Sequence, residues 1–403
     1  VGSGEKTGGL LSAEIRPAEM SEDILARQMC QKEVKMKIGV LTVYNVSNFG
    51  SFLQAYALKR WLENRGHEVY HIKVKTDREV QRGFYKYPAT RRSLTHPVEE
   101  FQKYRFGKVK YRYFMEALGD FREIQRAEAG NLDGILIGSD ELWNISEEEF
   151  QDPAYFGAGL PHSGVYGISV GRAGEKNFEE MPEYREYIRN LEFLTVRDRH
   201  TQELVQKITG KNPPMVCDPT FLTGPGILTK PCMDPYLSKH RYLLLYTYNF
   251  TIQNWTRDYV IRYAREKNLK LVSVGFYFSW CDYNVNCSPL EFSDVIRQAQ
   301  CMVTTTFHGS VMGVMNHKKL LAVPFSQKVG DLLRKLGMEN AVMETQMSYP
   351  EFRDRLDTFA PDYAESDRRI ERMGRESAEI LDTYLKQLET EKDRYPEKGW
   401  TNE

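Results

Sequence analysis

The sequence predicts an α/β protein built from two parallel-sheet halves with a cleft between them. Short apolar runs, typical of strands buried on both faces, alternate with amphipathic stretches at helical spacing from residue 36 to about residue 324. A Gly/Pro-rich stretch at 224–238 divides this alternation in two. Helices that connect parallel strands cover both faces of a sheet, and ligands usually bind between two such halves.

The composition is that of a globular protein. Its 403 residues suffice for two ordinary domains, and 41% are apolar and 28% charged. The 55 basic and 56 acidic side chains nearly cancel, so no overall field points to a nucleic-acid partner. Six cysteines form no CxxC pair, which argues against a zinc ribbon and indicates a reducing compartment. No apolar run is long enough to cross a membrane and no signal-peptide pattern opens the chain, so we expect a cytoplasmic location.

Residues 1–35 precede the first convincing strand. Residues 1–17 are rich in Gly, Ser and Glu, and residues 19–35 could form one polar helix. Met36 stands directly before the strand and could be the natural start of the chain. We therefore interpret 1–35 as an appendage, either a leader or a non-native extension.

The first half, 36–223, opens with a strand, a helix and a second strand. The apolar run at 38–44 predicts the first strand. An amphipathic helix is expected over 51–64, with Gly66 placed to end it, and the next strand over 69–74. Further strands are expected at 134–137, 165–170, 193–196 and 215–217.

A basic insertion at 78–113 interrupts the first half. Ten Lys and Arg face three Glu there, interleaved with Tyr and Phe. Such a segment could contact an anionic lipid surface or a lipid-linked acceptor. A solvated helical insertion is the simpler explanation of the same composition.

The second half, 239–345, follows the linker at 224–238. Its expected strands are 242–248, 271–276, 301–305 and 320–324, and its expected helices lie near 255–267, 289–299 and 310–316. The segment 346–403 is charged and is predicted to be a helical extension.

The sharpest candidate for chemistry is His308, in the segment Phe307-His308-Gly309-Ser310. A predicted strand ends and a helix begins there, which places the imidazole at the edge of the cleft. Gly309 lets a ligand approach the backbone closely, and Ser310 can cap the helix. An imidazole gives or takes a proton near neutral pH, so His308 could act as an acid or base. A structural histidine explains the residue equally well.

Two cations follow other predicted strands. Arg197 could hold a carboxylate or phosphate through two hydrogen bonds, although a surface pair with Asp198 explains it at least as well. Lys328 could neutralise a phosphate, although a solvated lysine is the simpler interpretation.

A polar turn containing Asn45, Asn48 and Gly50 follows the first strand. Open N–H groups at the start of the next helix favour an anion or a polar ligand. The turn has neither a GxGxxG nor a P-loop pattern, so neither a dinucleotide nor a nucleoside triphosphate is indicated. Side chains that cap their own helix would explain the same residue types.

A second polar turn contains Ser139, Asp140, Trp143 and Asn144. Ser139 or Asp140 is expected to cap a helix, and capping alone accounts for these residue types. Trp143 could form a platform for a sugar, but a core position is the favoured interpretation.

Together these segments resemble the polysaccharide pyruvyl transferase family. The resemblance rests on IGVLTVYNVSNFGSFLQAYALKRWLENRGHEV, ILIGSDELWN, LTVRDRHTQEL with CDPTFL downstream, and TTTFHGSVMGVMNHKKLLAVPF followed by KVGDLLRKLGM. These motifs occur in the family's order and cover about 37–337. The sequence departs from the usual pattern at Thr306, where serine is common, and at Glu141-Leu142, where Gln-Val is usual.

The resemblance implies a two-domain Rossmann-type transferase of the GT-B kind, with 36–223 on the acceptor side and 239–345 on the donor side. It implies transfer of a pyruvyl group from phosphoenolpyruvate to hydroxyls of a sugar in a cell-surface or exopolysaccharide precursor, forming a ketal. It implies no metal and no organic cofactor. The expected partners are phosphoenolpyruvate and a glycan or lipid-linked sugar, the latter met at the inner face of the membrane.

Carried over by motif, His308 becomes the general acid/base, and Arg197 and Lys328 bind the donor's phosphate and carboxylate. The implied donor site also includes Phe307, Gly309 and Ser310. The implied acceptor side of the cleft is formed by Asn45, Asn48, Gly50, Ser139, Asp140, Trp143 and Asn144. Two alternatives remain: a GT-B glycosyltransferase that uses a nucleotide sugar, and a non-catalytic glycan-binding relative.

Overall fold

A computed structural model describes residues 36–86, 94–248, 250–324, 327–343 and 345–394. Met36–Glu403 form one compact unit. The appendage predicted at 1–35 lies outside the described residues.

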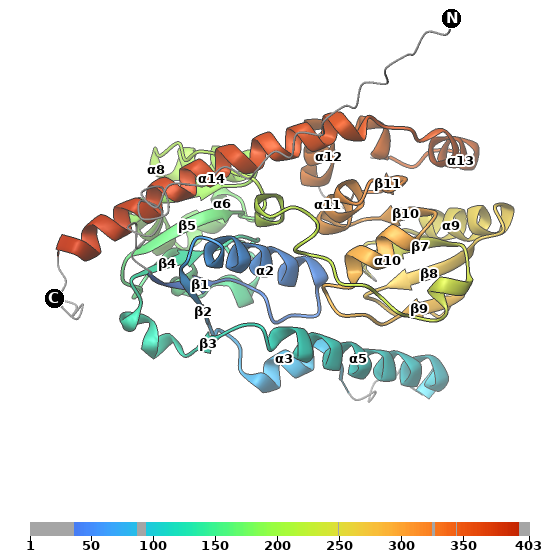
Figure 1. Ribbon diagram of the computed structural model, residues 1–403, viewed down its shortest axis with the longest axis horizontal. Coiled ribbons are helices and arrows are strands. Elements are labelled where there is room, and N and C mark those ends of the chain that lie inside the picture. The colour runs from blue at the N-terminus through green and yellow to red at the C-terminus, as the bar shows by residue number, and fades with distance from the viewer. Residues whose placement is uncertain (1–35, 87–93, 249, 325–326, 344, 395–403) are drawn as a thin grey trace, which may run out of the picture. The chain divides into compact units, whose positions relative to one another are not determined.

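The first sheet has six parallel strands in the order β3-β2-β1-β4-β5-β6 (Figure 1). Its strands are β1 (Lys37–Leu41), β2 (Glu68–Ile72), β3 (Glu123–Ile124), β4 (Gly134–Ile137), β5 (Ser163–Ile168) and β6 (Leu194–Val196). This is the strand order of a Rossmann sheet, in which the direction of strand addition reverses between β1 and β4.

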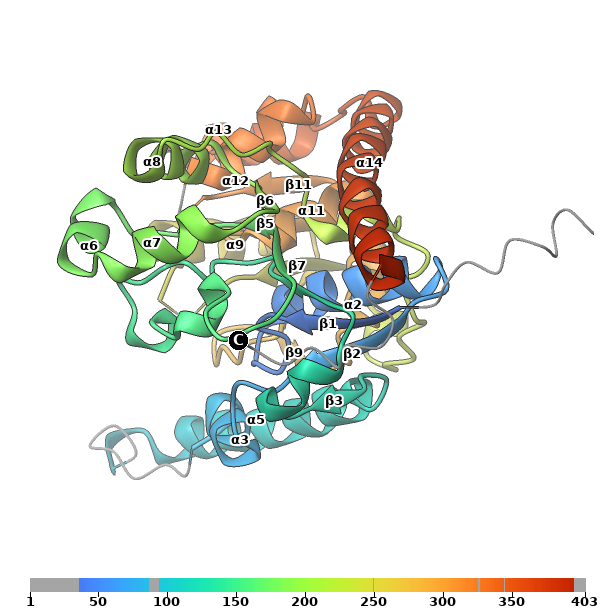
Figure 2. The same ribbon diagram turned by 90° about the vertical axis from the view of Figure 1, so that its left-hand side faces the viewer.

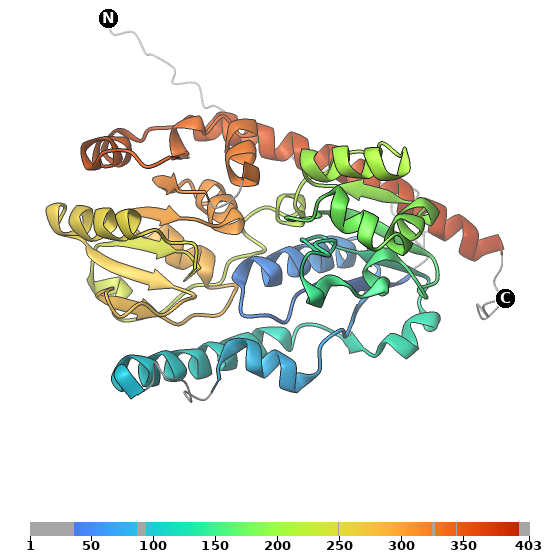
Figure 3. The same cartoon turned by 180° about the vertical axis from the view of Figure 1, so that it is seen from behind.

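The second sheet has five parallel strands in the order β11-β10-β7-β8-β9 (Figure 3). Its strands are β7 (Tyr242–Tyr246), β8 (Lys270–Val274), β9 (Tyr283–Val285), β10 (Cys301–Thr304) and β11 (Leu320–Ala322). Here the reversal falls between β7 and β10. The predicted fold class is confirmed: the chain contains two Rossmann-like parallel sheets.

The sequence missed two strands and overstated a third. Both missed strands, β3 and β9, are short edge strands of two and three residues, too brief to show a period. The strand expected at 215–217 is only an isolated bridge between Met215 and Val196. Pro213 and Pro214 precede it and lack the N–H that a longer ladder needs.

Helix α2 (Phe49–Glu63) begins after Asn48, whose side chain accepts a hydrogen bond from the Gly50 N–H. Gly66 follows the end of the helix at a φ of 87°, in the left-handed region that glycine tolerates best. The other α-helices of the described residues are α3 (Asp77–Phe84), α5 (Pro97–Leu118), α6 (Glu175–Glu180), α7 (Glu183–Asn190), α8 (Arg199–Thr209), α9 (Asn254–Glu266), α10 (Phe292–Gln298), α11 (Phe307–Met315), α12 (Gln327–Lys335), α13 (Tyr349–Thr358) and α14 (Tyr363–Arg394).

The C-terminal helix α14 returns to the first sheet (Figure 2). Its Leu381, Leu385 and Leu388 share one buried cluster with Ile38 of β1 and Leu62 of α2. Burying these leucines stabilises the docked helix by roughly 1.5–3 kcal/mol for each side chain. The predicted boundaries at 36–223, 239–345 and 346–403 stay predictions, but the described part of the last segment packs on the first sheet.

The basic insertion forms α3 and α5, and one of its lysines is buried rather than solvated. Lys110 is 2% exposed, and its Nζ donates to the carbonyl oxygens of Ser47 at 2.9 Å and Gly275 at 2.7 Å. Ser47 follows the first strand of one sheet, and Gly275 follows β8 of the other. The rings of Phe49, Phe114 and Phe276 surround the same ammonium, and their centroids lie 4.7–5.4 Å from its Nζ. Lys110 therefore joins the insertion to both sheets.

Candidate active site

Loops at the carboxyl ends of strands in both sheets line one cavity of about 810 Å³. Those loops include the ones at the two positions where strand order reverses, which is where open α/β sheets bind ligands. The residues that line the cavity and carry the argument below are Asn48, Asp140, Glu141, Asn144, Arg197, Tyr248, Phe250, Thr306, Phe307, His308 and Lys328.

His308 lies in the first turn of α11, beside this cavity. The helix is capped by Thr306, whose hydroxyl accepts a hydrogen bond from the Gly309 N–H at 3.0 Å. The expectation that Ser310 caps the helix is wrong: Ser310 lies one turn further on, and its hydroxyl donates to the Thr306 carbonyl at 3.0 Å. Gly309 and Ser310 are buried in the helix, whereas Phe307 and His308 line the cavity.

The His308 imidazole is 8% exposed, and its Nε2 has no hydrogen-bond partner among the described residues. Asp218 Oδ2 is 3.3 Å from this nitrogen, but the angles are not those of a hydrogen bond. The contact is therefore an electrostatic one between the imidazole and a buried carboxylate. An imidazole oriented by a carboxylate at the wall of a cavity is an arrangement that acid–base catalysis can use.

Gly50 supplies the space that the imidazole occupies. A Cβ atom at Gly50 would lie 2.1 Å from His308 Nδ1, well inside any allowed contact. The turn after β1 and the start of α11 therefore meet at this glycine. Gly50 itself does not line the cavity, but it packs against the imidazole that does.

Arg197 and Asp218 form a buried ionic group next to His308. The Arg197 guanidinium donates to Asp218 Oδ2 at 2.9 Å and to Asp140 Oδ1 at 3.0 Å. Asp198, the partner expected at the surface, instead caps α8 by accepting from the Thr201 N–H at 2.8 Å. The surface-pair interpretation of Arg197 is therefore wrong.

Asp218 is the residue that sequence reasoning missed. Burial by itself raises the pKa of its carboxyl, but the charges of His308 and Arg197 and the hydrogen bond from the Thr220 N–H hold that pKa below its usual range. Asp218 therefore carries a negative charge beside the imidazole. The available signal was its place in the CDPTFL motif, which by itself assigns the carboxylate no role.

Lys328 reaches the same cavity from α12, so the solvated interpretation of this lysine is wrong. It forms an ion pair with Glu141, and its Nζ lies 5.8 Å from the centroid of the Phe307 ring. The Arg197 guanidinium lies 5.3 Å from the same ring. Burial lowers the pKa of the Lys328 ammonium to about 8, and the charge of Asp140 acts in the opposite direction. Phe307 thus stands between the two predicted donor-binding cations.

The sequence model of one family, polysaccharide pyruvyl transferase, matches residues 48–326, which is more than half of the chain and contains Asp140, Arg197, Asp218 and His308 but ends two residues before Lys328. The chain belongs to the polysaccharide pyruvyl transferase family. No curated protein matches the sequence.

Solved structures align with this pyruvyl transferase family member at low identity and with TM-scores below 0.5. Arabidopsis thaliana UGT89C1 complexed with quercetin has a TM-score of 0.49 and 12% identity, covering 88% of this chain and 99% of that one. UDP-GlcNAc 2-epimerase from Neisseria meningitidis bound to UDP-GlcNAc has a TM-score of 0.48 and 9% identity, and the match covers 87% of this chain and 100% of that one. Identities this low transfer neither ligand nor reaction.

In each of the two polar turns of this family member, some residues line the cavity and others are buried in the core. Asn48 lines the cavity, and its Nδ2 donates to the Tyr248 hydroxyl at 3.0 Å, which links the two sheets. Asn45 is buried and does not line the cavity. The capping interpretation of this turn is also confirmed, because Asn48 caps α2.

No helix follows β4, so the expected cap at Ser139 or Asp140 is wrong. Asp140 instead forms a parallel bridge with Ile168, which extends the sheet edge by one residue. The Asp140 carboxylate accepts from the Ser51 hydroxyl at 2.9 Å as well as from Arg197. Ser139 is buried, and its hydroxyl donates to the Gly167 carbonyl at 2.7 Å.

Trp143 lies in the core and does not line the cavity. It is fully buried, its indole N–H donates to the Tyr155 carbonyl at 2.7 Å, and its ring stacks on Phe156. A sugar platform at this position is therefore ruled out. Its neighbour Asn144 does line the cavity.

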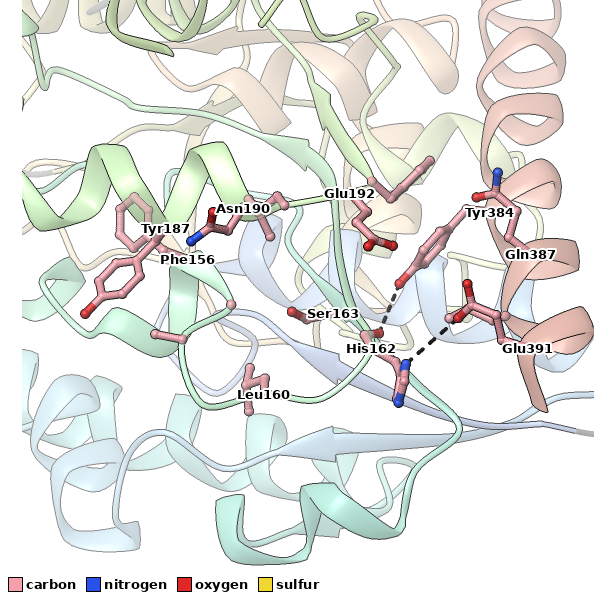
Figure 4. A pocket seen from close by; sticks show the side chains of 15 residues that line it. Phe156, Leu160, His162, Ser163, Tyr187, Asn190, Glu192, Tyr384, Gln387 and Glu391 are labelled. Atoms are coloured by element: carbon pink, nitrogen blue, oxygen red, sulfur yellow. Dashed lines mark hydrogen bonds and ion pairs between the residues drawn. The ribbon is translucent and has the colours of Figure 1, made fainter. Parts of the chain in front are cut away.

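A second cavity of about 370 Å³ lies at the amino-terminal ends of β5 and β6 (Figure 4). The Tyr384 hydroxyl, from α14, donates there to the His162 carbonyl at 3.0 Å. The cavity shares no lining residue with the one around His308.

Two searches cover only the part of the chain that the structure describes. No group of three or more His, Cys, Asp or Glu is placed there to hold a metal ion. Nor does any helix in that part combine the length and apolar character needed to cross a bilayer.

Proposed function

We propose that this protein transfers a pyruvyl group from phosphoenolpyruvate to two hydroxyls of a sugar in a cell-surface or exopolysaccharide precursor, forming a ketal. The observation that carries the proposal is that the His308 imidazole, beside the buried carboxylate of Asp218, lines a cavity that Arg197 and Lys328 also line. The cavity volume of about 810 Å³ is within the range of sites that enclose small molecules.

The reaction needs one proton relay. His308 protonates the methylene carbon of phosphoenolpyruvate, which leaves an oxocarbenium-like centre at the second carbon. A sugar hydroxyl attacks that carbon and returns its proton to the imidazole. Phosphate then departs, a second hydroxyl closes the ketal, and the proton of that hydroxyl leaves with the phosphate. Both hydroxyl protons are thereby accounted for, one in the new methyl group and one on phosphate.

Asp218 supports this relay as a positioning residue. Its Oδ2 lies 3.3 Å from Nε2, so the carboxylate can fix the orientation of the imidazole that must donate the first proton. Arg197 in turn holds Asp218 in place through its hydrogen bond. The three residues form a connected group whose charge is set before substrate binds.

The donor carries about three negative charges, which cations must balance. Arg197 still has N–H donors beyond those given to Asp218 and Asp140. Lys328 is paired with Glu141, so a donor phosphate or carboxylate must displace that side chain. Glu141 stands where the family usually has glutamine, so this competition is specific to chains with the acidic residue.

We further propose that the acceptor is a glycan or lipid-linked sugar met at the cytoplasmic face of the membrane. The insertion supports this, since α5 carries Lys103, Arg105, Lys108 and Arg112 together with the exposed Phe101. Basic segments with apolar side chains favour contact with anionic lipid headgroups.

The test is release of phosphate from phosphoenolpyruvate that depends on added sugar, measured together with the mass of the pyruvylated product. We expect His308→Ala to abolish both signals while circular dichroism and the unfolding midpoint stay close to those of wild type. Turnover of this variant at the wild-type rate would contradict the proposed role of His308 as the acid–base residue. UDP- and GDP-sugars in place of phosphoenolpyruvate test the glycosyltransferase alternative, and absence of any transfer would favour the non-catalytic relative.

A further inference from the structure

Tyr248 places a phenol at the wall of the cavity around His308. It follows β7 and lines the cavity together with Asn48, which comes from the turn after β1 in the other sheet. The two side chains meet there, since Asn48 Nδ2 lies 3.0 Å from the hydroxyl oxygen of Tyr248. The direction of this hydrogen bond decides what the phenol can offer to a ligand.

The hydrogen bonds around Asn48 fix that direction. A backbone N–H can only donate, and the Gly50 nitrogen lies 2.9 Å from one amide atom of Asn48, so that atom is the oxygen Oδ1. The other amide atom is therefore the nitrogen, which donates to the Tyr248 oxygen. Because the phenol accepts this bond, its own proton must point elsewhere. Among the described residues, the Tyr248 O–H has no acceptor.

The phenol of Tyr248 keeps its proton near neutral pH. Burial, the larger cause, and the charge of Asp140 raise the pKa of Tyr248 to about 12, and the hydrogen bond from Asn48 offsets only part of that rise. A protonated phenol can donate a hydrogen bond but is a poor base. Tyr248 is therefore suited to bind an oxygen of the substrate, not to remove a proton from it.

A neutral hydrogen-bond donor has a specific value in this cavity. Arg197 and Lys328 are already paired with carboxylates, so an anion must compete for both cations. The Tyr248 O–H has no carboxylate to displace. A hydrogen bond from such a group to a charged oxygen is about twice as strong as one between two neutral groups.

We infer that the Tyr248 O–H binds phosphoenolpyruvate, donating a hydrogen bond to an oxygen of its phosphate or carboxylate and remaining protonated through the reaction. The inference rests on the proposed function and adds to it a substrate-binding residue that no sequence motif indicates. The Asn48 amide occupies the phenol oxygen, which leaves the phenol proton for the substrate.

The test compares two phenols that both contact Asn48. Tyr248→Phe removes the phenol at the cavity wall. Tyr246→Phe removes the other one, whose hydroxyl donates to Asn48 Oδ1 at 3.3 Å but which does not line the cavity. Phosphoenolpyruvate is titrated calorimetrically into full-length wild type and both variants, and their unfolding midpoints are recorded. We expect Tyr248→Phe to weaken phosphoenolpyruvate by about 10- to 100-fold, whereas Tyr246→Phe should bind it as wild type does.

The transfer assay separates the two substrates. Tyr248→Phe should raise the KM for phosphoenolpyruvate by a similar factor and leave the KM for the sugar unchanged. A rise confined to the KM for the sugar, or wild-type affinity for phosphoenolpyruvate, would overturn the inference and leave the proposed function standing. Equal loss of affinity in Tyr248→Phe and Tyr246→Phe would also overturn it, because the effect would then arise through Asn48. No binding of phosphoenolpyruvate by wild type would refute the proposed function and the inference with it.

Discussion

Gly50 and His308 are in direct contact across the two sheets, and the space that a side chain would fill at position 50 is occupied by the imidazole. A Cβ built there would lie 2.1 Å from Nδ1 and 2.3 Å from Cγ of His308. The ring cannot keep its position if position 50 carries any side chain. The orientation of the candidate acid–base residue therefore depends on a glycine from the opposite half of the chain.

Gly50→Ala should displace the imidazole and lower the rate of phosphate release by about 100-fold. Overpacking at this contact should also cost about 1–3 kcal/mol of unfolding free energy. The control is Gly83→Ala, in helix α3, where an added Cβ meets nothing within 4 Å. That variant should keep full activity and stability, so equal behaviour of the two variants would contradict the steric role of Gly50.

Glu141→Gln should tighten binding of phosphoenolpyruvate by about tenfold, because it removes the carboxylate that competes for Lys328. The measurement is calorimetric titration of donor into both proteins. Glu149→Gln is the matched control, since Glu149 also lines the cavity but pairs with Lys75 instead of Lys328. Donor affinity that stays the same in Glu141→Gln would move the phosphate site away from Lys328.

Asp218→Asn should slow turnover by about 10- to 100-fold and change its pH profile, because the carboxylate beside His308 Nε2 becomes an uncharged amide. The same substitution tests stability in acid. The pKa of Asp218 is lower in the folded than in the unfolded chain, so the unfolded chain binds more protons as pH falls toward the folded value. Wild type should therefore lose stability on acidification more steeply than Asp218→Asn, as measured by urea unfolding between pH 7 and pH 3. Parallel curves would contradict the depressed pKa.

Lys110 should make stability increase with pH. Burial lowers the pKa of its ammonium to about 7, below the value of 10.5 for a free side chain. Between these values the unfolded chain binds more protons than the folded one, so the free energy of unfolding rises with pH. From pH 7 to pH 9 the free energy of unfolding of wild type should rise by about 2 kcal/mol more than that of Lys110→Met. The measurement is guanidinium unfolding of both proteins at each pH. A gain of the same size in both proteins would show that Lys110 does not titrate in this range.

The sequence could locate His308, Arg197 and Lys328 near one edge of the fold because each follows a predicted strand, and carboxyl ends of parallel strands meet at one edge. Apolar runs and helical spacing are local signals, so the central strands and the helices expected at 51–64, 255–267, 289–299 and 310–316 were predicted within a few residues of their bounds, whereas α6, α7, α8 and α12 were not predicted. The short edge strands β3 and β9 were missed because two or three residues show no period.

Only the tertiary structure decided which of these residues meet and what surrounds them. The group of Arg197, Asp218 and His308 joins three segments far apart in the chain, and no local pattern encodes their pairing. The same holds for Phe250, which the fold leaves exposed beside the cavity, whereas the core position of Trp143 was already the favoured interpretation of the sequence. Periodicity indicates only which face of an element is apolar. The order of strands in each sheet determines which loops become neighbours, and packing over the whole chain sets that order.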